Sequence, residues 1–450
     1  MQTGPLFAHP RPDDVVAYRR GVPITALELL TDAMELERHL PPGRNVLNVC
    51  LDRYRFTVGL IACLMSGRVS LLPSTHTPEV IRQLVTFAPD AFCLTDDPAC
   101  AIALPRLAYP ELDRAPVPWR VPQIPVTQLA AIVFTSGSTG TPLPHAKLWG
   151  RLARCVLDGA PRLGLLDGRR HTLIGTVPAQ HMYGFESTVL LALLSGNAFS
   201  AERPFYPADI GSAVADAPEP RALISTPVHL RTLLAAGIEL PPVDLIVSAT
   251  APLDRELARE VESRFRTHLI EIYGSTETGQ IATRRPVESL NWSLWPGVRL
   301  YEDRNEMFAC GGHVAQPTPL CDVLEIVDDR EFILHGRTTD LVNVAGKRSS
   351  FAYLNAQLNA IPGVVDGAFF QRETDAAGHT GVARLAAVVV APGLSAAELT
   401  LRLRERIDAL FLPRPLLLVA ELPRNATGKL PQAALEEFAA RHLKLHGPHG

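Results

Sequence analysis

Short apolar runs recur along the chain, and they end in small or polar residues. Six of them begin at residues 45, 129, 171, 221, 243 and 268 and read NVLNVCLD, LAAIVFTSG, HTLIGTVP, RALISTP, VDLIVSAT and HLIEIYGS. Between such runs lie segments with helical spacing, such as EVIRQLVTFA and ELAREVESRF. Strands that alternate with helices predict an α/β fold with parallel sheets.

Three of the predicted strands end in clusters of small polar residues, at Ser136, Ser225 and Gly274. In open α/β sheets, ligands bind at the carboxyl ends of the strands. We therefore expect the functional site along this edge.

The pattern changes after about residue 340. The passage FFQRETDAAGHTGVARLAAVVV resembles a hairpin, and SAAELTLRLRERIDALF resembles a helix in which Ser395 and Glu398 have the spacing of a capping box. One helical face carries Leu399, Leu403, Ile407, Leu410 and Phe411. We predict a large α/β domain at 1–338 and a small α+β domain at 339–450, with HGRTTDLVNVAGKR as the junction.

Composition restricts the class of ligand and the compartment. The chain has 43 Lys and Arg against 47 Asp and Glu, so it has no basic field that would favour nucleic acid. Its 7 cysteines form no C-x-x-C pair, which is typical of reduced cytosolic thiols. The N-terminus lacks signal-peptide features, and the longest apolar run, FTVGLIACLM, is about half of what a membrane span requires. We expect a cytoplasmic protein without a membrane span that binds a small ligand.

A Ser/Thr/Gly-rich stretch, FTSGSTGTPLPHAK, begins at Phe134. Its backbone amides and hydroxyls suit phosphate, and the candidate residues are Thr135, Ser136, Gly137, Ser138, Thr139 and Gly140. The Walker spacing is absent, because Thr141 and Pro142 follow Gly140, and this argues against a P-loop NTPase. Taken alone, the stretch could also be a flexible loop.

Further motifs change this interpretation. YGSTETG begins at Tyr273 and LPRNATGKL begins at Leu422. Together with the Ser/Thr/Gly-rich stretch and HGRTTDLVNVAGKR, they resemble the ordered motifs of the adenylate-forming superfamily of acyl- and aryl-CoA synthetases, luciferases and nonribosomal adenylation domains. The resemblance implies that ATP and Mg²⁺ are used to adenylate a carboxylate, with release of pyrophosphate, before the acyl group passes to a thiol. It also implies a small domain that rotates about a hinge.

The resemblance assigns roles to residues of these motifs. Lys429 would be the catalytic cation, Thr276 would bind the α-phosphate, and Glu277 would hold Mg²⁺. The nucleotide would be bound by Thr250, Ala251, Pro252, Tyr273, Gly274, Ser275, Asp322 and Arg337, with the Tyr273 ring on adenine and Asp322 and Arg337 near the ribose. Each of three assignments has an alternative. Tyr273 could be a tyrosine of the core, Asp322 a solvated loop aspartate, and Lys429 an ordinary exposed lysine.

Two positions depart from the family pattern. Leu143 occupies the place of the loop lysine, so either that lysine is dispensable or His145 or Lys147 supplies part of its charge. We favour dispensability, because Pro142 and Pro144 stiffen the backbone around Leu143. The hinge carries Thr339 before Asp340, and rotation would present Gly346 and Lys347 to a thiol tunnel.

The resemblance also implies an acid pocket, formed by His181, Tyr183, Ser225, Ser248, Ala249 and Gly279. Small and polar side chains suit a hydroxylated ring better than a long alkyl chain, although His181 could instead be a core histidine. A closer resemblance, carried by TSGSTG-x-P-x-P-H-x-K followed by Trp149, is to ligases of xanthomonadin and aryl polyene pathways.

That closer resemblance implies a hydroxybenzoate-type aryl acid as substrate and the phosphopantetheine of an acyl carrier protein as acceptor. Coenzyme A as acceptor, and a catalytically weakened adenylate-binding protein, remain alternatives. A set of arginines could dock an acidic carrier protein, or could simply be the solvated face of a helix: Arg402, Arg404, Arg406, Arg414 and Arg424.

Overall fold

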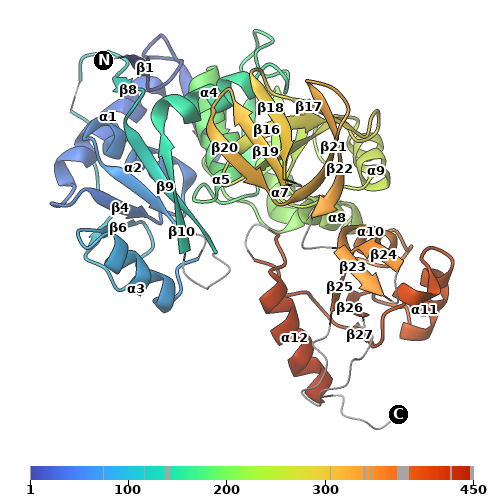
Figure 1. The fold of residues 1–450 in the computed structure, drawn as a ribbon. Helices are drawn as coiled ribbons and strands as arrows, with labels where there is room; N and C mark the ends of the chain where they lie inside the picture. Colours follow the sequence, from blue (N-terminus) through green and yellow to red (C-terminus); the bar gives the residue numbers. More distant parts are fainter. Residues whose placement is uncertain are drawn as a thin grey trace.

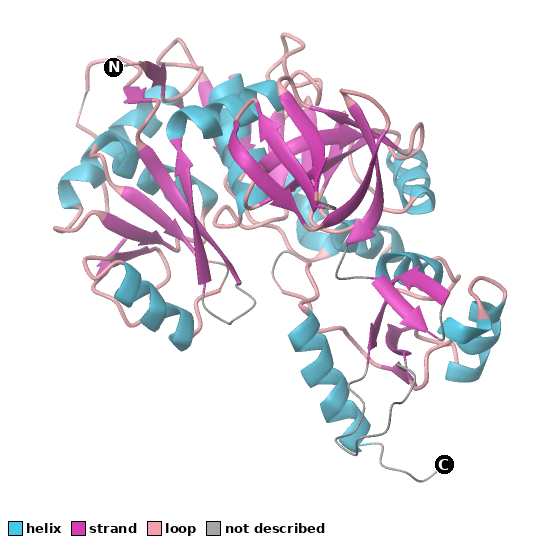
Figure 2. Ribbon diagram, viewed as in Figure 1, coloured by secondary structure: helices cyan, strands magenta, loops and turns pink. Residues whose placement is uncertain are grey.

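The computed structural model describes the chain except for residues 1, 74, 116, 137–141, 305, 338–340, 345–346, 372–384, 426–427 and 446–450. For residues 136, 337, 341–344, 347–350, 352–353, 432–433 and 443–445 it describes the backbone alone. Two mixed sheets with helices form the large N-terminal part, and a smaller α+β part follows (Figure 1). A separate three-stranded sheet lies beside the larger mixed sheet (Figure 2).

The first sheet has the strand order β10-β9-β5-β4-β6-β7. Its strands are β4 (Asn45–Asn48), β5 (Val69–Leu72), β6 (Phe92–Thr95), β7 (Arg106–Ala108), β9 (Leu129–Ser136) and β10 (Pro142–Leu148). The helices of this region are α1 (Ala26–His39), α2 (Arg53–Met65), α3 (Pro78–Phe87) and α4 (Trp149–Gly159), and β1 (Thr3–Pro5) pairs with β8 (Gln123–Pro125). Strand β10 is an edge strand, where prolines are tolerated.

The second sheet has the order β21-β22-β17-β16-β15-β14-β13-β11-β12-β2-β3. Its strands are β2 (Val15–Arg19), β3 (Val22–Thr25), β11 (Thr172–Gly175), β12 (Ala198–Ser200), β13 (Arg221–Ser225), β14 (Leu245–Ser248), β15 (His268–Ser275), β16 (Gly279–Arg284), β17 (Asn291–Leu294), β21 (Asp322–Ile326) and β22 (Glu331–Arg337). Its helices are α5 (Met182–Gly184), the π-helical η1 (Phe185–Leu190), α6 (Leu191–Ser195), α7 (Pro207–Asp216), α8 (Pro227–Ala235) and α9 (Arg255–Phe265). Strands β18 (Val298–Asp303), β19 (Glu306–Gly311) and β20 (Val314–Leu320) form a separate antiparallel sheet.

The α/β fold class is confirmed, and each of the six apolar runs forms a strand, namely β4, β9, β11, β13, β14 and β15. The two segments with helical spacing lie in α3 and α9. Strand direction needs a correction, because the sheets are mixed: β10 runs antiparallel to β9, and β16 runs antiparallel to β15. A strand's own residues carry the same pattern whichever way its neighbour runs, so the direction comes from the connections.

The C-terminal part contains β23 (Leu341–Val344), β24 (Lys347–Ser350), α10 (Phe351–Asn359), β25 (Asp366–Gln371), β26 (Leu385–Val390), α11 (Ala396–Arg404), η3 (Ala409–Phe411), β27 (Leu416–Leu418) and α12 (Gln432–Leu445). It has its own apolar core, which includes Leu354, Leu399 and Leu403. The predicted hairpin exists, since β25 pairs antiparallel with β26. The proposed boundary between 338 and 339 falls outside the described residues.

The predicted helix after residue 395 is shorter than expected. Ser395 and Glu398 form the capping box, but α11 ends at Arg404. The Asp408 side chain then accepts a hydrogen bond from the Leu410 amide and starts a 3₁₀ turn. Leu410 is consequently exposed, and a continuous apolar face through 411 is wrong.

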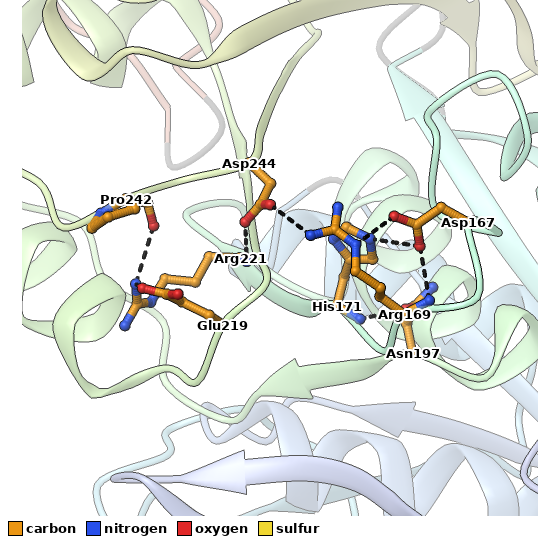
Figure 3. A network of polar contacts seen from close by, with 8 residues as sticks. All are labelled: Asp167, Arg169, His171, Asn197, Glu219, Arg221, Pro242 and Asp244. Carbon is orange, nitrogen blue, oxygen red and sulfur yellow. Dashed lines mark hydrogen bonds and ion pairs between the residues drawn. The ribbon is translucent and has the colours of Figure 1, made fainter.

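A polar network joins the loops at the amino ends of the parallel strands (Figure 3). The Asp244 carboxylate accepts hydrogen bonds from the Arg221 amide at 3.0 Å and from Arg169 Nη1 at 3.2 Å. Asp167 in turn lies 3.1 Å from His171 Nε2. This network closes the edge opposite the predicted site.

Two expectations from composition can be compared with the structure. The seven cysteines are all free thiols, and Cys50, Cys63, Cys93 and Cys155 are buried. No helix in the described ranges combines the length and the apolar character needed to cross a bilayer.

Candidate active site

The predicted adenine and ribose residues lie together. The Tyr273 hydroxyl, at the end of β15, donates a hydrogen bond of 2.5 Å to Asp322 Oδ2, at the start of β21. The Tyr273 ring packs against Trp292 and Phe332 at centroid distances of 5.6 and 5.4 Å, while the residue stays partly exposed. Asp322 is the register partner of Arg337, whose side chain lies outside the described part. Two residues 49 positions apart thus form one polar and aromatic surface.

The loop after β14 is held in a strained conformation. Thr250 has a φ of 81°, which a β-branched residue rarely adopts, and Ala251 and Pro252 follow it. Further along, the Leu253 amide donates a 3.0 Å hydrogen bond to the buried Glu271, which pairs with Arg284 at 2.7 Å. Burial raises the pKa of Glu271 to about 7, although Arg284 opposes this. A buried ion pair therefore supports the predicted adenine wall.

Strand β10 presents Leu143, His145 and Lys147 on one face, because alternate residues of a strand share a face. Leu143 is exposed. His145 Nε2 lies 2.8 Å from Thr135 Oγ1, at the end of β9, and 3.6 Å from Glu277 Oε1. One histidine thus joins the predicted phosphate loop to the predicted metal ligand.

Lys147 makes a contact that the sequence analysis did not predict. Its Nζ donates to the Thr276 carbonyl at 2.5 Å and approaches the Glu277 carbonyl at 3.3 Å. Burial lowers the pKa of this lysine. Within the same turn, the Ser275 amide donates a 3.1 Å hydrogen bond to Thr278 Oγ1. Lys147 of the edge strand β10 therefore stabilises the backbone of the loop that is expected to bind the α-phosphate and Mg²⁺.

Three residues of the predicted acid pocket lie at the ends of the neighbouring strands β13 and β14, and Tyr183 of α5 packs against them. Tyr183 donates a 3.1 Å hydrogen bond to the Val247 carbonyl, and Ser225 Oγ lies 3.2 Å from Thr176 Oγ1. Ser248 is fully buried, and its hydroxyl has no hydrogen-bond partner among the described residues. Ala249 is buried next to it. The strand ends expected from the sequence thus converge.

His181 lies at the N-terminus of α5, where positive groups surround it. Its pKa is lowered to about 4, mainly by burial, and Lys429, His76 and Arg203 contribute in the same direction. The charge of Lys429, in the C-terminal part, thus contributes to the electrostatics at His181. Sequence reasoning missed His76 and Arg203, which belong to none of its motifs.

The loop that carries Lys429 packs on the start of α8. At Gly428, which has a φ of 75°, an added Cβ would lie 3.3 Å from Thr226 Oγ1. The Lys429 amide donates to Asn425 Oδ1 at 2.9 Å, which shapes the turn. Arg424 forms two hydrogen bonds with Asp366, at 2.6 and 2.7 Å, so this arginine of the predicted docking set is held within the small domain.

Several predicted residues lie outside the described part: Gly137, Ser138, Thr139, Gly140, Thr339, Asp340 and Gly346. The backbone alone is described for Ser136, which ends β9, and for Lys347, which begins β24. Their assigned roles remain predictions.

The described residues suit a magnesium ion that arrives with a nucleotide. In the described ranges no group of three or more His, Cys, Asp or Glu residues could hold a metal by itself. Mg²⁺ is commonly bound by one or two carboxylates together with substrate phosphates and water. A single carboxylate, Glu277, which shares the neighbour His145 with the Thr135 hydroxyl, fits that donor set.

The structure also contains a charged residue that sequence reasoning missed, Glu186. It is 2% exposed and lies on η1, next to Cys155 and Gln280. The available signal was a lone acidic residue within the apolar run FESTVLLALL. Long π-helical segments are rare and occur often at functional sites.

Comparison with known proteins is consistent with this geometry. Residues 11–336 match the AMP-binding enzyme family. The chain belongs to that family. The prediction of an acid–thiol ligase that forms an acyl-adenylate is thereby confirmed at the level of the family.

Relatives of this AMP-binding enzyme include a protein named 4-coumarate--CoA ligase from Rhodobacter capsulatus, 33% identical over 279 residues, which cover 62% of this chain and 68% of the relative. Another is named 4-chlorobenzoate--CoA ligase, from Arthrobacter sp, 25% identical over 359 residues, covering 70% and 66%. The solved structure of o-succinylbenzoate CoA synthetase from Bacillus subtilis with its acyl-adenylate aligns with a TM-score of 0.79 at 18% identity, covering 96% and 98%. This structural likeness shows a shared fold.

Proposed function

We propose that the protein adenylates a hydroxybenzoate-type aryl acid with ATP and transfers the acyl group to a phosphopantetheine thiol. The observation that carries the proposal is the packing of the loop that holds Lys429 against the start of α8, where an added Cβ at Gly428 would lie 3.3 Å from Thr226 Oγ1, next to Ser225 of the predicted acid pocket. The names of two relatives, which refer to coumarate and chlorobenzoate, support an aryl acid.

The chemistry requires two anions, a carboxylate and a phosphate, to be brought together. Lys429 would neutralise charge where they meet, and preorganised charges of this kind are among the largest contributions to catalysis. His181 stays uncharged near neutral pH because its pKa is about 4, so its neutral ring would offer one N–H donor to a nearby carboxylate. Mg²⁺, held by Glu277, would stabilise the leaving pyrophosphate.

Tyr273 and Asp322 would orient the nucleoside, and the strained loop at Thr250 would form the opposite wall. The role of Lys147 is indirect, because its ammonium contacts backbone carbonyls of Thr276 and Glu277. It would therefore position the loop that carries the predicted phosphate and metal ligands. Positioning within the site can account for a large share of a rate enhancement.

The phosphopantetheine thiol occurs in both coenzyme A and acyl carrier proteins. Relatives named as CoA ligases support the first source. The resemblance of the Ser/Thr/Gly-rich stretch to carrier-protein ligases supports the second, as do three exposed arginines of the small domain, Arg404, Arg406 and Arg414. Such a charged surface would mainly accelerate association.

Pyrophosphate release measured over a panel of hydroxybenzoates and medium-chain fatty acids tests the acid. The product's mass, measured with coenzyme A and carrier protein in competition, tests the source of the thiol. We expect release with hydroxybenzoates and an acylated phosphopantetheine product. Preference for fatty acids would contradict the aryl assignment, and release without any acylated thiol would contradict the second half-reaction.

A further inference from the structure

A cavity of about 160 Å³ lies between β10, α4, η1 and β20, beside the turn from β15 to β16. Its lining includes Lys147, Cys155, Met182, Glu186, Gly279 and His313. Gly279 belongs to the predicted acid pocket, and Met182 stands between its residues His181 and Tyr183 in the chain. The cavity therefore adjoins the acid pocket.

Gly279 lies where the cavity meets the predicted acid pocket, and its lack of a side chain leaves room there. It has a φ of 74°, and an added Cβ would lie 3.0 Å from Glu186 Oε1, 3.3 Å from Cys155 Sγ and 3.6 Å from His313 Nε2. A side chain at this position would crowd all three groups. The glycine thus allows a ligand held near β15 to reach the polar wall of the cavity.

Glu186 is the buried acid of that wall. It accepts hydrogen bonds from the Cys155 thiol, at 3.3 Å, and from both the side-chain and the backbone amide of Gln280, and none of these donors is charged. Burial raises the pKa of Glu186 to about 7, and the charge of Lys147 and the hydrogen bonds from Cys155 and Gln280 oppose this. A carboxylate has about four lone-pair sites, so these three donors leave Glu186 acceptor capacity for a further hydrogen bond.

Two further groups of the cavity lining, His313 and Lys147, are compatible with a ligand that donates. His313 is 6% exposed, and neither ring nitrogen makes a well-formed hydrogen bond to a described residue, although the Thr278 carbonyl is near enough to favour the protonated ring. Burial lowers its pKa to about 4, so the ring is neutral and offers one acceptor nitrogen. Lys147 directs its ammonium at the carbonyls of Thr276 and Glu277 and is not free to hold an anion.

We propose that this cavity receives the ring substituent of the aryl acid, and that Glu186 selects acids whose ring carries a hydrogen-bond donor, a hydroxyl or an amino group. The proposal rests on the proposed function, since it assumes that the acid carboxylate lies near His181 and Lys429. An acid without a donor would leave the Glu186 carboxyl desolvated and unsatisfied. Sites built to bind a substrate hydroxyl reject analogues that lack it far more strongly than apolar pockets reject an extra group.

Calorimetric binding, with AMP present, compares 3- and 4-hydroxybenzoate, 4-aminobenzoate, benzoate and 4-chlorobenzoate on the full-length protein. We expect at least one donor-bearing acid to bind about tenfold or more tightly than benzoate. In Glu186→Leu this preference should reverse in favour of 4-chlorobenzoate. Glu186→Gln, which preserves the shape of the side chain, should reduce the preference by about tenfold or more while benzoate affinity changes by less than about threefold.

Equal affinities across the panel in the unmodified protein would overturn the proposal. A uniform loss for every acid in Glu186→Gln, with an unchanged melting temperature, would also overturn it. Pyrophosphate release measured with the same panel distinguishes failure of the proposed ligase function from failure of the proposed selectivity of Glu186. Release without a preference for donor-bearing acids would support the ligase function and contradict the role of Glu186. Selective binding without any release would support the role of Glu186 and contradict the ligase function.

Discussion

Replacing Lys147 with methionine would remove a charge while preserving most of the side chain's length. The ammonium donates to the Thr276 carbonyl at 2.5 Å and approaches that of Glu277 at 3.3 Å. A hydrogen bond with a charged partner contributes about 1.5–3 kcal/mol, and carbonyls left without their donor incur a desolvation penalty of about 1–3 kcal/mol. If the loop needs this support in the adenylation transition state, we expect the substitution to raise the activation free energy by about 1.4–2.8 kcal/mol. That increase corresponds to a reaction about 10- to 100-fold slower.

The assay is acid-dependent pyrophosphate release, with thermal unfolding recorded for each variant. Arg38→Met is the matched control, since it also replaces a cation with methionine but lies at the exposed end of α1. We expect Lys147→Met to lower kcat/KM within that range and Arg38→Met to change it by less than about twofold. The reasoning fails if Lys147→Met retains its rate within about threefold, or if both variants lose the same factor.

Three further predictions concern the proposed catalytic lysine, the proposed hinge and a buried histidine. Lys429→Ala should slow adenylation by about 100- to 1000-fold while sparing transfer from a preformed acyl-adenylate, and equal losses in both half-reactions would argue against its role. Thr339→Pro should slow thioester formation more than adenylation, because proline fixes φ at the proposed hinge; unchanged transfer kinetics would place the pivot elsewhere. Burial lowers the pKa of His229 to about 4, so the unfolded chain binds a proton below about pH 6.5 that the native state excludes, and stability falls as the pH drops. The unfolding free energy should therefore fall by about 2 kcal/mol less between pH 7 and pH 5 in His229→Gln than in the unmodified protein. Urea unfolding at both pH values measures this, and an equal fall in the two proteins would refute it.

Local features of this protein could be read from the sequence because they depend on neighbours in the chain. Apolar, β-branched runs such as LAAIVF and RALIS favour strands by their side-chain packing, and they became β9 and β13. The capping box of Ser395 and Glu398 needs residues only three positions apart. Four short motifs in order were sufficient to indicate the family.

The predicted convergence of strand ends also followed from sequence, through a rule about parallel sheets. Ser225 and Ser248 end adjacent parallel strands and are register partners in the structure. Tyr273 and Asp322 are different, because their contact depends on the antiparallel strands that follow β15. Residue type suggested their roles, and tertiary structure brought them together.

The sequence by itself determined the strands, the order of the motifs and the chemical character of the residues at the strand ends. Tertiary structure alone decided that Lys147 supports a loop 129 positions away and that Glu186 shares a cavity with His313. Such contacts arise where separate elements pack, and neither residue's neighbours in the chain specify which element that will be. The same packing withdraws Glu186 from water, and this desolvation raises its pKa and gives an otherwise ordinary glutamate its proposed selectivity.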